Sequence, residues 1–520
     1  MTIKRRHAWL AGVSASAVVG FFVCAGVGVR AAGSDARLID AVKAGNRAAA
    51  AAIVKQPGVV NSPEQDGTTA LHWAVRGDDA EMVKLLLAAG ADVKAANRYG
   101  VRPLGLAAVN GNAALVKLLL AAGADPNATV SDAGETPLMS AARTGRVEPL
   151  RLLLSKGASV NVHETEFGET ALMWAASENH ADAVRLLVEH GADLNAKSAH
   201  APATRARGRI ALGEWTPLMY ASRQGAMDST RVLVDLGADI NARASDGSTA
   251  LILAIINSHY ELASMLVGRG ADPNVADSTG MAPLYAAVDM NTLSWAIGRA
   301  APKQTDEIDS LDMIRLLLEW GADPNATLKT RKLARGQNAG DPDLGAGSTA
   351  LMRAAKTGDL AAMHLLLDYG ADPTLRQKNG TTLFMIAAGM GWRGGFDTNR
   401  HRGTEAGAIE TMKLCLALGA EVNAVNEEKQ NALHGAVGRG ESVLEFLVAH
   451  GADLHARDKK GQTPLDLAIS LRDFDTDTDH VGPEIRSHAV VVLERLGGVT
   501  TPASQPRHPA TSSQLSSSPE

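Results

Sequence analysis

Apolar positions along the chain recur with the spacing of short amphipathic helices, and these helices recur in pairs. An example is "TALHWAVRGDDAEMVKLLLAAGAD" (residues 69–92), in which a polar turn separates two apolar-periodic segments. Each pair is followed by Gly-Ala-Asp or a close variant, whose glycine lies at positions 90, 123, 157, 191, 237, 270, 321, 370, 419 and 451. One pair has too little apolar surface to form a core alone, so the pattern predicts helical hairpins that stack on their neighbours.

Each hairpin carries its own start and end signals. Threonine stands at the N-cap position of many first helices, for instance Thr136 and Thr216, where its hydroxyl can accept a hydrogen bond from the first turn. Proline follows both threonines, at the first helical position. The N–H that proline lacks would have no partner within the helix there. The glycine of Gly-Ala-Asp can adopt the left-handed conformation that ends a helix. The expected fold is an all-α solenoid of roughly 10–12 helix-turn-helix units with β-turn tips.

These repeats resemble the ankyrin repeat family, whose pattern of about 33 residues includes T-P-L-H-x-A. The resemblance covers residues 65–470, and we expect the repeat array to span 65–498 after a degenerate capping repeat at 34–64. It implies a protein-binding role, without catalysis and without a cofactor.

One column of the repeat departs from the family pattern. The histidine of T-P-L-H is present as His72 and His434, and methionine replaces it in other copies, at Met139, Met173, Met219, Met352 and Met385. The methionines therefore lack the side-chain hydrogen bonds that usually brace neighbouring turns. Core packing is the expected role of this column, and copper binding is the alternative.

Composition and charge narrow the function. Apolar residues make up 45% of the chain and aromatic residues only 4%, which indicates a core of alanine, leucine and valine between closely spaced helices. The formal charge of −6 gives no overall basic surface, so we do not expect nucleic acid as a partner. The only cysteines are Cys24 and Cys415, and we expect Cys415 to be buried, because other copies carry leucine or valine at its position.

The N-terminus has the layout of an export signal. Three basic residues precede an uncharged run from Ala8 to Val29, and small residues follow, with a plausible cleavage site after Ala31. We interpret residues 1–31 as a signal peptide, with an uncleaved inner-membrane anchor as the alternative. The expected location is then periplasmic or secreted. The Ser- and Pro-rich tail, residues 499–520, is expected to be disordered.

Insertions interrupt the regular repeat at residues 198–212, 292–309, 328–346 and 391–407. Loops that a rigid scaffold tolerates are frequent recognition sites. The first, third and fourth insertions carry net charges of +3, +2 and +1 in a chain that is negative overall. We therefore predict an acidic partner, with arginine forks that pair carboxylates or phosphates. The alternative is that these loops are merely solvated. The predicted contact residues are Arg205, Arg207, Arg209, Trp215, Arg223, Gln224, Lys329, Arg331, Trp392 and Arg393.

Two of these residues, Trp215 and Trp392, are expected to be exposed aromatic anchors for a partner, and Arg223 and Gln224 are expected to face the groove at the end of a first helix. Filling gaps between repeats is the competing role for the aromatic residues. Trp174 and Tyr220 occupy equivalent first-helix positions in adjacent repeats.

Two motifs suggest other chemistry and do not fit their context. "GMGWRG" (389–394) has the spacing of a dinucleotide-binding turn, but a helix precedes it where that fold requires a strand. Residues 473–484, "DFDTDTDHVGPE", place carboxylates as in a calcium loop, yet Thr478 stands where the loop needs glycine. We therefore expect neither a nucleotide site nor a metal site, although calcium at 473–484 stays open.

The expected function is an exported, monomeric, non-catalytic scaffold that binds another protein through its concave face and its basic inserted loops. The alternative is an enzyme or small-ligand receptor that uses a pocket between insertions 292–309 and 391–407. A buried polar cluster between those two loops would favour the alternative, and a shallow solvated surface would favour the scaffold.

Overall fold

The structure is a computed structural model that describes residues 36–199, 213–292, 307–330, 344–390, 404–473 and 483–500. The predicted signal segment 1–31, the central parts of the insertions, most of the possible calcium loop 473–484 and nearly all of the predicted tail lie outside the described residues.

Within the described ranges the chain forms 24 α-helices and no strand, which confirms the predicted all-α solenoid. The first helices of the repeats are α1 (Arg37–Lys43), α3 (Ala70–Arg76), α5 (Pro103–Asn110), α7 (Pro137–Thr144), α9 (Ala171–Ser177), α11 (Pro217–Gln224), α13 (Ala250–Ile256), α15 (Pro283–Thr292), α17 (Ala350–Thr357), α19 (Leu383–Ala388), α21 (Ala432–Ala436) and α23 (Pro464–Asp473). The second helices are α2 (Arg47–Ile53), α4 (Ala80–Ala88), α6 (Ala113–Ala121), α8 (Val147–Ser155), α10 (Ala181–Glu189), α12 (Met227–Asp235), α14 (Tyr260–Gly268), α16 (Ser310–Glu319), α18 (Leu360–Asp368), α20 (Glu405–Ala417), α22 (Glu441–Ala449) and α24 (Pro483–Arg495).

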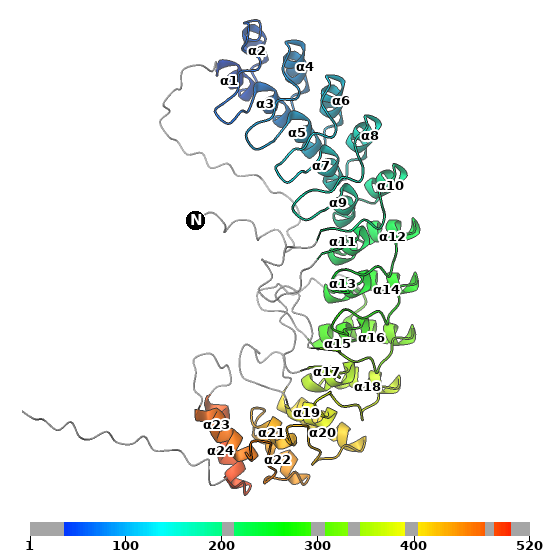
Figure 1. Ribbon diagram of the computed structural model, residues 1–520, viewed down its shortest axis with the longest axis vertical. Coiled ribbons are helices and arrows are strands. Elements are labelled where there is room, and N and C mark those ends of the chain that lie inside the picture. Colours follow the sequence, from blue (N-terminus) through cyan, green and yellow to red (C-terminus); the bar gives the residue numbers. More distant parts are fainter. Residues whose placement is uncertain are drawn as a thin grey trace, which may run out of the picture.

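The hairpins stack side by side into an arc. The first helices line its inner side and the second helices its outer side (Figure 1). Each first helix packs against its own second helix and against the first helix of the next repeat. Among the described helices, none combines the length and the apolar character that crossing a bilayer requires.

The predicted caps are present. The Thr136 hydroxyl accepts a hydrogen bond from the Met139 N–H at 3.3 Å, and Pro137 is the first residue of α7. At the other end of a hairpin, Gly90 has φ +86°, the left-handed conformation that ends the second helix. A side chain with a Cβ would be strained there, so this glycine sets the direction in which the chain leaves α4.

The core is a continuous layer of small and aliphatic side chains between the helices. The methionine column is part of it, since Met139, Met173, Met219, Met352 and Met385 are each at most 1% exposed. Cys415 is buried as expected, and burial raises the pKa of its thiol to about 12. The methionines thus serve as packing groups.

The two histidines of that column brace neighbouring repeats. His72 Nε2 donates to the Val101 carbonyl oxygen at 3.0 Å, and His434 Nε2 donates to the Gln462 carbonyl oxygen at 3.2 Å. His72 Nδ1 accepts from the Thr69 N–H, which requires an unprotonated Nδ1. Methionine has no N–H for the bracing bond, although the Met139 sulfur accepts from the Thr136 N–H at 3.4 Å.

Replacing both histidines by methionine should flatten the pH dependence of stability. Burial lowers the pKa of His72 and of His434 from the ordinary 6.5. Just below pH 6.5 these histidines are therefore mostly protonated in the unfolded chain while they stay neutral in the folded chain. The folded state therefore loses stability as the pH falls from about 6.5 towards the lowered pKa values, by up to about 1.4 kcal/mol per pH unit for each histidine. Urea unfolding of the His72→Met/His434→Met variant across this pH range should show a smaller decline than the parent. An equal decline would assign the acid sensitivity to other groups.

At most joints between repeats, an asparagine four residues after the glycine of Gly-Ala-Asp, or Asn61 at the equivalent position of the capping repeat, ties one repeat to the next. At Asn127, for example, Nδ2 donates to the Gly157 carbonyl oxygen at 2.9 Å and Oδ1 accepts from the Ser159 N–H at 2.7 Å. We call this column the asparagine ladder; its members are Asn61, Asn127, Asn161, Asn195, Asn241, Asn274, Asn325 and Asn423. The ladder satisfies main-chain groups that the end of a helix leaves without partners.

Candidate binding face

The side chains four and seven positions after the N-cap of each first helix form what we call the inner row. In α9, for example, these positions are Trp174 and Ser177, which are only partly buried. The row belongs to the first helices, which line the inner side of the arc (Figure 1).

The indole of Trp174 contacts a carboxylate at its edge and a guanidinium over its face. Its indole Nε1 donates to Glu169 Oε2 at 2.7 Å, and the guanidinium of Arg143, from the preceding first helix α7, lies 5.0 Å from the ring centroid. In the described part of the chain no carboxylate forms an ion pair with Arg143. Stacking on the ring therefore fixes a guanidinium whose charge stays available to a partner.

The same arrangement recurs at Trp73. Its Nε1 donates to Glu64 Oε2 at 2.7 Å, and the Arg76 guanidinium lies 5.2 Å from the ring centroid. The ammonium of Lys43 lies over the same ring at 4.2 Å. Two separate repeats thus combine an acid at the indole edge with an arginine over the indole face.

Three predicted contact residues, Trp215, Arg223 and Gln224, belong to the neighbouring repeat. The rings of Trp215 and Tyr220 meet edge to face with centroids 5.5 Å apart, and the Arg223 guanidinium lies 5.2 Å from the Trp215 ring. Gln224 is exposed at the end of α11. The structure therefore places Trp215 and Arg223 in one cluster, next to Trp174 along the inner row.

The expectation that Trp215 is an exposed anchor is wrong. It is only partly exposed, because it packs against Tyr220 and against the core, and its buried Nε1 has no hydrogen-bond partner. The Arg223 guanidinium lies over its ring.

Glu169 links the two halves of this cluster. It accepts from Trp174 and from the Tyr220 hydroxyl, and burial still raises the pKa of its carboxyl above the usual value. The pKa of Tyr220 is raised too, first by burial and then by the Glu169 charge. The carboxylate is thus directed at neighbouring groups of the chain, and its charge also acts on Arg223.

The remaining predicted contact residues do not join this cluster in the described structure. Lys329 is exposed, and its N–H donates to the Thr279 carbonyl oxygen at 2.7 Å, in the turn before α15. Arg205, Arg207, Arg209, Arg331, Trp392 and Arg393 lie outside the described residues. In the described ranges no group of His, Cys, Asp and Glu side chains is arranged to hold a metal ion.

A buried ion pair joins α15 to α17, next to the start of insertion 292–309. Arg353 Nε donates to Asp289 Oδ1 at 2.7 Å, and the two side chains are 1% and 5% exposed. Nearby, Asn291 Nδ2 donates to Asp359 Oδ2 at 2.5 Å. A buried polar cluster between insertions 292–309 and 391–407 would favour a pocket there. This cluster lies beside the start of the first of them, and most of both insertions lies outside the described residues.

Three residues that carry much of the inner row, Trp73, Arg76 and Arg143, were not among the predicted contact residues. The missing signal was the register of the repeat. Arg76, Arg143 and Arg223 all stand seven positions after an N-cap threonine, so aligning the first helices on that threonine would have placed them in one column.

Comparisons with known proteins place most of the chain in one family. The family described as Ankyrin repeats (3 copies) matches residues 38–130, 128–198, 218–328 and 401–476, and Ankyrin repeat matches residues 346–378. A Danio rerio protein, Notch-regulated ankyrin repeat-containing protein A, is 49% identical over 49 residues, which are 9% of this chain and 44% of the relative. The Homo sapiens Notch-regulated ankyrin repeat-containing protein gives the same identity over 43% of its length. The matched segment spans less than half the length of these relatives.

Proposed function

Because the chain belongs to the ankyrin repeat family, a family of protein-binding scaffolds, we propose that it binds another protein through the inner row of its arc. The observation that carries the proposal is the cluster of tryptophan, tyrosine and stacked arginine on α7, α9 and α11. These are the residue types that dominate binding energy at protein interfaces.

The arginines of the row support an acidic partner. A guanidinium that already rests on an indole loses little freedom when it pairs a carboxylate, and its fork can hold both oxygens. Three acidic side chains that contact residues of the row are engaged: Glu64 and Glu169 accept from the indoles, and Glu135 accepts from the Ser140 hydroxyl at 2.7 Å. At Arg143, a partner therefore meets a cation backed by the ring of Trp174.

The spacing of these arginines suggests the form of the partner. Arg76, Arg143 and Arg223 come from α3, α7 and α11, which are alternate first helices, and Val109 and Ser177 occupy the column between them. Packed helices lie roughly 8–10 Å apart, so successive arginines are roughly 20 Å apart. An extended chain rises about 3.3 Å per residue, and carboxylates about six residues apart would match this spacing.

The export of the scaffold and the role of its basic loops belong to the same proposal. The signal-like N-terminus supports a periplasmic or secreted location, and the positive charge of insertions 198–212 and 328–346 would extend the basic character of the inner row. The chain would act there as a monomer and without catalysis.

The test is the affinity of variants for the native partner. The full chain would capture its partner from the extracytoplasmic fraction, mass spectrometry would identify it, and Kd would be measured with the purified partner by calorimetry. Trp174→Ala should weaken binding by about 30-fold or more, because it removes an anchor of about 2 kcal/mol and unseats Arg143.

Trp320→Ala is the matched control. Trp320 is 53% exposed at the end of α16, a second helix on the outer side of the arc, so its loss should leave Kd unchanged. Equal affinities of the parent and the Trp174→Ala variant, with both chains folded, would move the binding surface away from the inner row.

A further inference from the structure

The asparagine ladder is interrupted between the repeats of α4 and α6. Lys94 stands at the ladder position there, and its side chain makes no hydrogen bond in the described structure. The groups that an asparagine would satisfy are the Gly123 carbonyl oxygen and the Asp125 N–H. In the described part of the chain neither has a protein hydrogen-bond partner.

A second departure from the repeat pattern falls at the same joint. Gly105 occupies the histidine and methionine column, so a large core side chain is missing from α5. Val130 fills part of the space, since a Cβ on Gly105 would lie 2.2 Å from the Val130 Cγ1 atom. A cavity of about 240 Å³ remains beside it.

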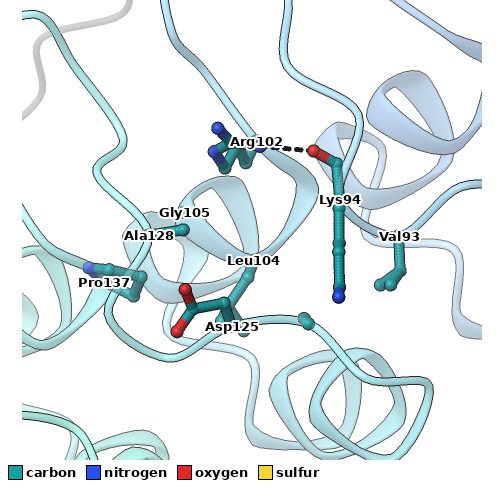
Figure 2. A pocket seen from close by; sticks show the side chains of 9 residues that line it. Val93, Lys94, Arg102, Leu104, Gly105, Asp125, Ala128 and Pro137 are labelled. Atoms are coloured by element: carbon teal, nitrogen blue, oxygen red, sulfur yellow. Dashed lines mark hydrogen bonds between the residues drawn. The ribbon is translucent and has the colours of Figure 1, made fainter.

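The walls of the cavity are polar and apolar in nearly equal parts. Figure 2 shows Lys94, Arg102 and Asp125 around Leu104, with the Arg102 guanidinium bonded to the main-chain oxygen of Lys94. The buried Arg102 Nε has no hydrogen-bond partner. Leu104 and Pro137 supply apolar surface. The joint thus offers a main-chain donor, the Asp125 N–H, and a main-chain acceptor, the Gly123 carbonyl oxygen. Both lie next to the apolar surface of Leu104 and Pro137.

We propose that this joint, the ladder cavity, binds a primary carboxamide on a short aliphatic stem, the chemistry of a glutamine or asparagine side chain. The ligand NH₂ donates to the Gly123 carbonyl oxygen, its oxygen accepts from the Asp125 N–H, and its stem packs on Leu104 and Pro137. The asparagines of the ladder make this pair of bonds at other joints of the same chain, so the pairing is one that the fold already uses.

A carboxylate fits less well, although Lys94 and Arg102 are cationic. It has no donor for the Gly123 carbonyl oxygen, and it would meet the Asp125 carboxylate, which lines the same cavity. Discrimination between amide and acid therefore tests the proposal independently of the inner row.

Saturation-transfer NMR on the full chain can make the comparison with propionamide and propionate. A ligand of this size in a small open cavity should bind with Kd of the order of 10 mM, and propionate should bind at least tenfold more weakly. Acetyl-glutamine N-methylamide separates two sources of the amide: tighter binding than propionamide indicates a side chain of a partner protein, and weaker binding indicates a free amide. Propionate binding as tightly as propionamide would overturn the proposal.

Variants that complete the ladder provide the control. Lys94→Asn places the chain's own carboxamide in the gap, so it should weaken propionamide binding at least tenfold and raise the thermal midpoint. Thr374 interrupts the ladder at another joint, where Met385 fills the column that Gly105 leaves empty. Thr374→Asn should raise the midpoint and leave propionamide binding unchanged. Full propionamide binding by a folded Lys94→Asn chain would contradict the assignment.

Discussion

Replacing Asp289 by alanine is expected to lower the free energy of unfolding by about 3–5 kcal/mol. The reason is burial: Arg353 is 1% exposed, and the substitution removes the carboxylate that receives its Nε–H at 2.7 Å. A guanidinium charge kept from water without that partner is costly, whereas the intact pair adds little net stability of its own. Urea unfolding followed by circular dichroism measures the difference.

A double substitution separates the loss of the pair from the loss of packing. Asp289→Leu combined with Arg353→Met replaces both charges by apolar groups of similar size, and it should recover most of the stability that Asp289→Ala loses. If the double variant is as unstable as the single one, α15 and α17 depend on the charges for a different reason, such as support of the neighbouring insertions.

The solenoid was predictable because its signals are local and repeated. An N-cap threonine such as Thr136, the helical period after it and the glycine that ends the second helix each act within a few residues, and their recurrence fixes how the units stack. The buried methionine column follows from the same register. Stacking of like units then leaves few alternatives for the core.

The inner row was harder to predict because its contacts cross between repeats. Arg143 rests on Trp174, a residue of the following repeat, so no local pattern joins the two. Trp215 was predicted to be an exposed aromatic anchor and Arg223 to lie at the end of a first helix. The predicted exposure of Trp215 was wrong, because its ring packs against Tyr220. The pairing of Asp289 with Arg353 was not predicted for the same reason, because an insertion separates the two residues in the sequence.

The stacking of repeats also determines how the molecule should unfold. Each repeat touches mainly its neighbours, so a weak unit in the middle separates the two ends instead of lowering the stability of the whole array evenly. Leu187, fully buried in α10, lies in such a central unit, directly behind the first helix that carries Trp174.

Leu187→Ala should therefore cost about 3–5 kcal/mol and change the shape of the unfolding curve. Truncating a buried leucine loses apolar contact and leaves a cavity. We expect a single urea transition to divide into two, because α9 and α10 no longer couple the repeats on either side. The fluorescence of Trp174 should follow the earlier transition, and partner binding should be lost with it, well before circular dichroism reports complete unfolding. Leu236→Ala, at a position 38% exposed just after α12, is the matched control and should leave one transition. A single, uniformly shifted transition for Leu187→Ala would mean that coupling between repeats exceeds the loss in one of them, and that the inner row melts only with the whole arc.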